Sequence, residues 1–260
     1  QEIIEKIDIG GISLIRAGAK NYNDVVIVAS KAQYEPLMNM LRAQGANSTL
    51  ADRKWFAKEA FAVSSWYDSA IFNYFDAGEF SAFRCTYNKK MSLRYGENPH
   101  QQGCFFGDFN AMFTQIHGKE ISYNNLLDIS AAVDLIDEFD ETTFAILKHN
   151  NACGIASRDT LMQAWVDALA CDPVSAYGGV LIANDAIDKS VAEEINKIFF
   201  EVIIAPKYTE EAVEILCQKK NRIILIRKDM EMPKMQVRSA LNGVLFQEKD
   251  LDIEAPSDLK

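Results

Sequence analysis

Short apolar runs alternate with helical patterns through the second half of this chain, and that alternation constrains its fold more than any other feature. The runs have the length of buried strands, and the segments near them carry apolar residues at helical spacing. Strands are predicted at 144–147, 179–183, 201–205, 222–227 and 243–246, and helices at 129–139, 160–170, 190–199 and 210–219. Strands that alternate with helices of this length predict βαβ units around a mostly parallel sheet, and hence an α/β fold.

The first portion of the chain has a different pattern. One apolar run, at 25–29, predicts a buried strand, and helices are predicted over about 32–44 and 52–75. The many aromatic side chains of the second helix favour packing in a core or an interface. One strand is too few for a sheet, so this portion is expected to be the end of a domain that begins earlier in a longer protein.

A domain boundary is predicted just after this portion. The helical pattern breaks at Asp76-Ala77-Gly78, and the segment 85–90 that follows is polar. Glycine at such a position is a strong breaker of regular structure. We therefore predict two domains, 1–84 and 85–260.

The charge of the chain excludes some classes of partner. Its formal net charge is −10 and its sequence pI is about 4.9. This acidity disfavours nonspecific binding to nucleic acid, which depends on Lys and Arg contacts with phosphates. It is compatible with a small phosphorylated ligand, because one local cationic pocket is sufficient. No apolar run is long enough for a bilayer, and the first residues lack a signal-peptide pattern, so a cytoplasmic protein with no membrane contact is expected.

The cysteines are scattered singly through the sequence, at Cys85, Cys104, Cys153, Cys171 and Cys217. An odd, dispersed set with no CxxC pair predicts free thiols in a reducing compartment, and it disfavours a zinc site. Cys153 could act as a nucleophile activated by His149. We disfavour that role, because neighbours along a strand point to opposite faces.

The most informative motif is Lys148-His149-Asn150-Asn151-Ala152-Cys153-Gly154, which follows the predicted strand at 144–147. Gly154 permits a tight turn, and a helical pattern is expected from about Arg158. Ligands bind at the carboxyl ends of strands in open α/β sheets, and His titrates near neutral pH. The motif therefore predicts proton-transfer chemistry, although a single His at a strand end is more often a structural residue with a hydrogen-bonding role.

Five further segments are rich in polar residues together with Gly or Pro, as ligand-binding loops are; they are 7–11, 94–101, 118–125, 172–179 and 200–206. The second combines a guanidinium, a phenol, an imidazole and amides, a set that suits an oxyanion or phosphate. The fourth ends in a glycine pair, which lets the backbone approach a ligand. Each segment alone is weak evidence, because charged turns are usually only solvated turns.

Together and in this order, the motifs resemble those of the bifunctional purine-biosynthesis enzymes that are both AICAR transformylase and IMP cyclohydrolase. The bacterial pattern reads I-D-I-G-G, R-Y-G-E-N-x-H-Q, K-H-x-N-P-C-G, D-P-x-S-A-F-G-G and V-E-V-I-I-A-P. The resemblance runs from end to end of the chain, with small departures. Ala152 and Ile12 stand where Pro is usual, Tyr177 where Phe is, and Phe200 where Val is. None of them removes a residue with an expected chemical role.

The resemblance implies a role for several residues after the boundary. His149 matches the general base that takes a proton from the amine of AICAR as it attacks the formyl carbon of 10-formyltetrahydrofolate. Lys148 matches the cation that stabilises the transition state, which is sensible because the attack builds negative charge on oxygen. Four residues match contacts with the nucleotide, namely Arg94, Tyr95, Gly178 and Glu201.

The resemblance also implies a site before the boundary and a fold for each portion. Asp8, Ile9 and Lys20 match the cyclohydrolase site, where Lys20 would assist the ring closure that forms IMP. The fold implied for 1–84 is the C-terminal part of a doubly wound, methylglyoxal-synthase-like domain, the IMP cyclohydrolase. The fold implied for 85–260 is one cytidine-deaminase-like α/β domain without the zinc signature, the first half of the transformylase.

Members of this family are roughly twice as long as this chain, so the resemblance implies an internal fragment of a homodimeric enzyme. Its expected ligands are AICAR, FAICAR and IMP, with 10-formyltetrahydrofolate as co-substrate and no metal. Two interpretations of the chain stay open. It is either a segment of an enzyme or a catalytically silent folded fragment that at most binds nucleotide. A dinucleotide oxidoreductase is disfavoured, because no GxGxxG motif follows a strand.

Overall fold

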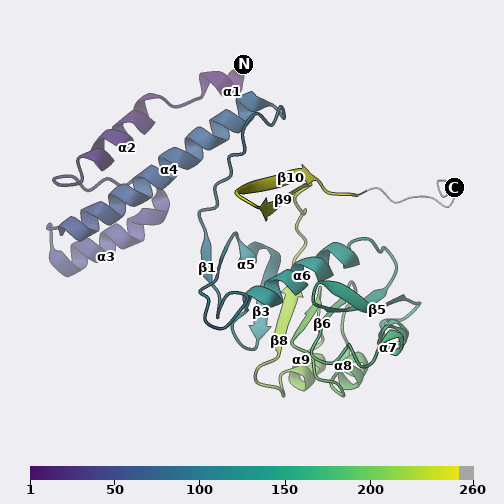
Figure 1. Ribbon diagram of the computed structural model, residues 1–260. Coiled ribbons are helices and arrows are strands. Elements are labelled where there is room, and N and C mark those ends of the chain that lie inside the picture. The colour runs from purple at the N-terminus through teal and green to yellow at the C-terminus, as the bar shows by residue number, and fades with distance from the viewer. Residues whose placement is uncertain (252–260) are drawn as a thin grey trace. The chain divides into compact units, whose positions relative to one another are not determined.

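The structure is a computed structural model that describes residues 1–251, and it divides into two compact units (Figure 1). Unit 1 is Gln1–Lys89 and unit 2 is Lys90–Lys260. The division falls a few residues after the boundary predicted from the sequence. The assignment of each unit to one domain of the bifunctional family stays a prediction.

Unit 1 is helical. Its helices are α1 (Glu2–Glu5), α2 (Gly10–Lys20), η1 (Lys31–Gln33), α3 (Tyr34–Gln44) and α4 (Leu50–Asp76). The long helix α4 begins with reciprocal hydrogen bonds: Asp52 N–H donates to the Thr49 hydroxyl at 3.1 Å, and Thr49 N–H donates to the Asp52 carboxylate at 2.8 Å. Hydrogen bonds from the Thr49 hydroxyl and N–H lower the pKa of Asp52 from its ordinary value.

The predicted strand at 25–29 is wrong. No strand forms within residues 1–89, and 25–29 has no regular secondary structure and is half-buried. Ile27 and Ala29 pack against the small core that Ala19 of α2 forms with two alanines of α4. The apolar run is therefore explained by burial against two helices. The doubly wound architecture expected for this portion is not seen, because residues 1–89 contain no sheet.

Unit 2 contains all the strands of the described chain. They are β1 (Lys90–Ser92), β2 (Cys104–Phe106), β3 (Phe113–His117), β4 (Thr143–Lys148), β5 (Asn151–Ser157), β6 (Val180–Ala183), β7 (Val202–Ala205), β8 (Ile223–Arg227), β9 (Met235–Ala240) and β10 (Gly243–Glu248). Its helices are α5 (Phe109–Met112), α6 (Tyr123–Ile136), α7 (Leu161–Cys171), α8 (Lys189–Ile195) and α9 (Glu210–Leu216). Every strand and helix predicted in this unit is present, with shifted ends.

The central sheet of unit 2 is mixed. Its six strands lie in the order β3-β8-β7-β6-β4-β5. Strands β6, β7 and β8 are parallel to one another, whereas β3 is antiparallel to β8, and β4 is antiparallel to both β6 and β5. The predicted α/β fold is confirmed, but the prediction of a mostly parallel sheet is wrong. An apolar run marks a buried strand without specifying its direction.

Helices cover both faces of the central sheet (Figure 1). Alternate side chains of a strand point to opposite faces, so Phe144 and Ile146 of β4 join the core under α7, α8 and α9. Ala145 and Leu147 join the second core, under α6. Trp165 of α7 packs edge-on against Phe144, with ring centroids 5.0 Å apart. Packing on both faces holds the strands in place, and the candidate site lies at their ends.

Two antiparallel pairs, β1–β2 and β9–β10, lie outside the central sheet. The side chains of β10 are all exposed. Among residues 1–251, the structure has no helix that combines the length and the hydropathy needed to cross a membrane.

Candidate functional site

Several of the predicted ligand segments meet at one edge of the central sheet. Because β4 runs antiparallel to β6, the carboxyl end of β4 lies beside the amino ends of β6, β7 and β8. Lys148 ends β4 and His149 follows it, Gly178-Gly179 precedes β6, and Glu201 precedes β7. Lys148 and His149 therefore lie at the carboxyl end of a strand, as predicted. That strand is antiparallel to its neighbours, however, and not parallel as predicted.

His149 lies in a two-residue hairpin turn between β4 and β5. His149 and Asn150 have φ angles of 55° and 62°, the positive values that primed hairpin turns require. Asn150 N–H donates to the Asp128 carboxylate of α6 at 2.8 Å, and the Asn151 amide donates to the His149 carbonyl oxygen at 2.9 Å. The first hydrogen bond holds the turn against α6 and the second closes the turn itself, while His149 stays exposed.

Gly154 has a different role from the one predicted. It lies within β5 and not in a turn, and the next helix, α7, begins at Leu161 and not near Arg158. A Cβ atom on Gly154 would lie 2.0 Å from the carbonyl oxygen of Ala168 in α7. Glycine is therefore needed here because the backbones of β5 and α7 approach closely.

Cys153, beside Gly154, is not set up as a nucleophile. Its thiol donates to the Ile146 carbonyl oxygen at 3.4 Å. Burial raises the pKa of the Cys153 thiol, so the thiolate is scarce at neutral pH, the reverse of an activated cysteine. All five cysteines are free thiols. Across residues 1–251 no three or more His, Cys, Asp or Glu side chains group as metal ligands would.

Lys148 connects the end of β4 to the loop before β6. Its ammonium group donates to the Tyr177 carbonyl oxygen at 2.9 Å, and two of its three protons remain available. Gly178 has a φ of 78°, and its N–H donates to the Phe199 carbonyl oxygen at 2.8 Å. A Cβ atom on Gly179 would lie 2.8 Å from a carbonyl oxygen of β4. Gly179 therefore lets this loop pass close to β4, whereas Gly178 supplies the positive φ that its conformation requires.

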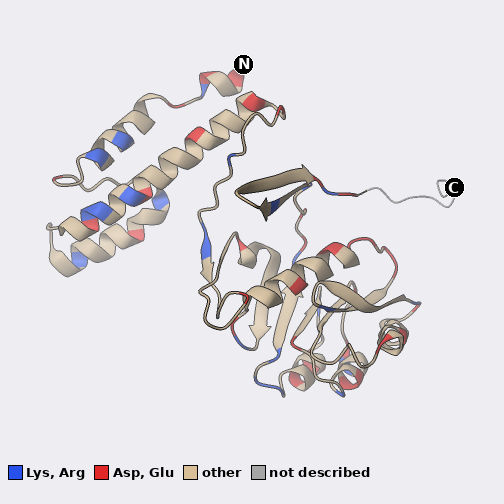
Figure 2. Ribbon diagram, in the orientation of Figure 1, with Lys and Arg blue, Asp and Glu red and all other residues tan. Residues whose placement is uncertain are grey.

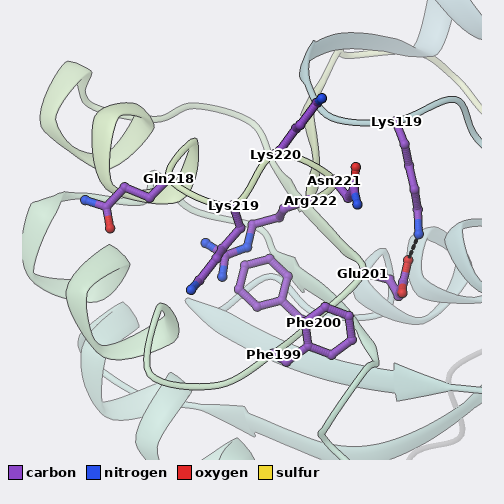
Figure 3. A pocket seen from close by; sticks show the side chains of 9 residues that line it. All are labelled: Lys119, Phe199, Phe200, Glu201, Gln218, Lys219, Lys220, Asn221 and Arg222. Atoms are coloured by element: carbon purple, nitrogen blue, oxygen red, sulfur yellow. Dashed lines mark hydrogen bonds and ion pairs between the residues drawn. The ribbon is translucent and has the colours of Figure 1, made fainter.

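A cavity of about 350 Å³ lies beside Glu201 (Figure 3). The Glu201 carboxylate forms an ion pair with Lys119, which follows β3, and the two side chains are 29% and 20% exposed. The other lining residues come from the segment before β7 and the loop between α9 and β8; they are Phe199, Phe200, Gln218, Lys219, Lys220, Asn221 and Arg222. We call this site the basic cavity.

The loop that holds Arg94 and Tyr95 packs against the segment that follows β3. Arg94 N–H donates to the Ile121 carbonyl oxygen at 3.3 Å, and the Asn124 amide donates to the Glu97 carbonyl oxygen at 3.1 Å. The Arg94 guanidinium lies 4.6 Å from the centroid of the Tyr95 ring and donates to its hydroxyl at 2.7 Å. One backbone hydrogen bond and one from the Asn124 side chain thus connect this loop to the segment that carries the lysine of the Glu201 ion pair.

The three predicted site residues of unit 1 are not brought together. The Asp8 carboxylate accepts hydrogen bonds from the N–H groups of Gly11 at 3.0 Å and Ile12 at 2.8 Å, which caps α2. The Ile9 side chain is 71% exposed. Lys20 lies in the last turn of α2, roughly 16 Å along the axis from Ile9 at the usual rise per residue. Asp8 and Ile9 therefore mark one end of α2, and Lys20 marks the other.

Lys119 lies in the predicted ligand segment 118–125, but sequence reasoning missed four other residues at this edge of the sheet: Asp128, Lys219, Lys220 and Arg222. The last three form the run Lys-Lys-Asn-Arg before a strand, a basic cluster in an acidic chain that could have drawn attention. No pattern in the sequence marks Asp128, because its contact with the hairpin turn depends on how α6 packs.

Comparison with known proteins agrees with the motifs. A sequence model of the AICARFT/IMPCHase bienzyme family matches residues 18–260. The chain is 72% identical to a bifunctional purine biosynthesis protein PurH from Bacteroides thetaiotaomicron, and 42% and 38% identical to proteins of the same name from Rhodospirillum rubrum and Ruminiclostridium cellulolyticum. The three matches cover 100% of this chain and 51%, 52% and 53% of the relatives, so the chain spans about half the length of the curated relatives it matches. By these matches, the chain belongs to the AICARFT/IMPCHase bienzyme family.

Proposed function

We propose that this chain provides part of an enzyme of purine biosynthesis with two activities. One transfers the formyl group of 10-formyltetrahydrofolate to AICAR, and the other closes the product, FAICAR, to IMP. Family membership supports the proposal. The observation that carries it is the meeting of Lys148 and His149 with the Gly178 loop and Glu201 at one edge of the sheet.

In the formyl transfer, the amine of AICAR attacks the formyl carbon and a new C–N bond forms. His149 accepts the proton that the amine loses, a role that its exposed side chain at the turn allows. Lys148 stabilises the negative charge on the formyl oxygen with the protons that Tyr177 does not accept. The C–N bond to the folate breaks, and its nitrogen leaves with a proton. Arg94, Tyr95, Gly178 and Glu201 hold the nucleotide.

We infer that unit 1 belongs to the cyclohydrolase, as the end of a methylglyoxal-synthase-like domain, and that Asp8, Ile9 and Lys20 act in ring closure. Unit 2 is then the first half of the transformylase, with a cytidine-deaminase-like fold, in an enzyme that acts as a homodimer. Sedimentation equilibrium of the intact enzyme tests the dimer. Limited proteolysis tests the division of the chain into two domains, because cleavage should begin in the segment between α4 and β1.

Separate assays of the two half-reactions in the intact enzyme test the roles of individual residues. His149→Ala should lower formyl-transfer turnover by about two to four orders of magnitude, with nucleotide binding nearly unchanged. Arg94→Ala should weaken nucleotide binding more than it lowers turnover. Lys20→Ala should impair only ring closure, and so serves as the control for the other two. Unchanged formyl transfer in His149→Ala would contradict the proposal.

A second candidate is a folded segment that binds nucleotide without catalysing either reaction. The half-length match to the relatives favours it for the 260-residue chain by itself. Binding energy from remote groups positions the reactants, so this chain alone should show little or no formyl transfer. Turnover near that of a full-length relative would exclude this candidate.

A further inference from the structure

We propose that Asp128 is a positioning residue for formyl transfer, because its carboxylate holds the turn that presents His149. The role of His149 as general base belongs to the proposed function, and the inference rests on the proposed function in that respect. The contact between Asp128 and the turn is a feature of the structure alone. The two parts can therefore be tested separately.

The imidazole of His149 has no hydrogen-bond partner of its own in the described part of the chain. The residue takes part only through its carbonyl oxygen, which accepts from the Asn151 amide. In many active sites a third group orients the catalytic base through a hydrogen bond to its ring. Here the direction of the ring depends on the backbone of the turn instead. A contact that fixes the turn therefore also fixes the position at which the proton is accepted.

The turn has a conformation that needs support from outside. His149 and Asn150 have φ angles of 55° and 62°, in the left-handed region that costs energy for residues other than glycine. Such conformations persist where the surrounding structure enforces them. Turns of this type favour Asn-Gly, and the pair here is His-Asn. This turn therefore depends more on contacts with other elements than an Asn-Gly turn would.

Two hydrogen bonds hold the chain on either side of His149. Before it, the Lys148 ammonium group donates to the Tyr177 carbonyl oxygen at 2.9 Å. After it, Asn150 N–H donates to the Asp128 carboxylate at 2.8 Å. The first contact is made through a long, flexible side chain, whereas the second joins the backbone itself. Asp128 therefore constrains the backbone directly beside the proposed base.

A general structural role does not account for Asp128. The charged residues of α6 are Asp128 and Asp134, and Figure 2 shows acidic residues on this helix in red. Asp134 pairs with Lys249 at 2.7 Å, whereas Asp128 forms no ion pair within residues 1–251. Asp128 does not cap α6 either, because the Ser122 side chain does so. The contact with the turn is what explains a carboxylate at this position.

Helix α6 also holds the loop that is proposed to bind the nucleotide. One turn before Asp128, the Asn124 amide donates to the Glu97 carbonyl oxygen at 3.1 Å, in the loop that follows Arg94. Residues four apart lie on the same face of a helix. The helix therefore sets the separation between the proposed base and the loop. The geometry of bound reactants strongly affects the rate of a reaction between them.

Steady-state kinetics of formyl transfer in the intact enzyme test the role of Asp128. Asp128→Ala should lower kcat by about 10- to 100-fold, because a misplacement of about 1 Å can cost about 100-fold, with the KM for AICAR nearly unchanged. Asp128→Asn keeps a side-chain oxygen that can accept from Asn150 N–H, so it should restore kcat to near the wild-type value. If Asp128→Asn were as slow as Asp128→Ala, or if Asp128→Ala were as fast as the wild type, the inference would be wrong.

A double variant tests whether Asp128 acts through His149. Effects of residues that act as a unit are not additive. In the His149→Ala background, Asp128→Ala should therefore lower kcat no further. A second loss as large as that of Asp128→Ala alone would show that Asp128 acts on another group, and it would overturn the inference.

NMR of this chain tests the contact itself, without any assay of activity. Backbone chemical shifts of His149 and Asn150 report their φ angles, and Asp128→Ala should lose the left-handed values that the wild type and Asp128→Asn keep. If Asp128→Ala kept them, the inference would be refuted and the proposed function would stand. If it lost them while formyl transfer stayed normal in both Asp128→Ala and His149→Ala, the role of His149 in the proposed function would be wrong, and the inference would fail with it.

Discussion

Replacing Gly154 by alanine would test how far the close approach of β5 and α7 stabilises the fold around the hairpin. The new Cβ atom would lie 2.0 Å from the Ala168 carbonyl oxygen and 3.4 Å from the Cβ atom of Cys171. Ordinary carbon–oxygen contacts are about 3.3–3.6 Å, so the two elements must separate by roughly 1.3–1.6 Å. A backbone carbonyl cannot rotate away as a side chain can. Overpacking costs about 1–3 kcal/mol, and we expect the upper end of that range.

Thermal unfolding followed by circular dichroism measures this cost. A loss of about 3 kcal/mol should lower the melting temperature of a domain of this size by roughly 6–12 °C. Gly243→Ala is the matched control, because a Cβ atom there meets nothing within 4 Å. It should melt within about 2 °C of the wild type. If Gly154→Ala also melted that close to the wild type, the inferred need for close contact would be refuted.

Three further predictions concern single residues. Because burial raises the pKa of the Cys153 thiol, iodoacetamide at pH 8 should modify it more slowly than exposed Cys85, as measured by peptide mass spectrometry. Equal rates would contradict this. Asp128→Ala removes a hydrogen bond to the hairpin turn, so it should lower the free energy of unfolding by about 1–2 kcal/mol. In the intact enzyme it should lower formyl-transfer turnover more than nucleotide affinity. Asp134→Ala, on the same helix, should leave that turnover unchanged. Trp165 is buried in the core, so Trp165→Ala should lower the free energy of unfolding by about 3–5 kcal/mol, as measured by urea denaturation.

The sequence could predict which segments of unit 2 form strands, but not how they run. The run at 144–147 is buried on both faces and was recognised as a strand from its composition. Its direction depends on the turn at His149-Asn150, which closes a hairpin with β5. His-Asn is a weaker hairpin signal than Asn-Gly, so the residues alone predict a tight turn at Gly154 and a mostly parallel sheet, and they do not reveal the hairpin.

Sequence motifs predict some residues of the candidate site, but they do not predict residues that reach the site only through the packing of a helix. Lys148, His149, Gly178 and Glu201 were identified from the resemblance, and β4 and its neighbours do bring their segments to one edge. Asp128 contributes through a contact across 22 residues of sequence. Contacts of this kind depend on the position of α6 over the sheet, which residue spacing does not specify.

The direction of β4 has an electrostatic consequence. Helices α7, α8 and α9 each precede one of the parallel strands β6, β7 and β8, so their carboxyl ends face the edge that holds His149. Helix carboxyl ends carry partial negative charge, and the amino ends that commonly bind anions lie at the opposite edge. An anion at the His149 edge would therefore be held by side-chain cations, against the dipoles of these helices. Its binding should therefore weaken as the salt concentration rises.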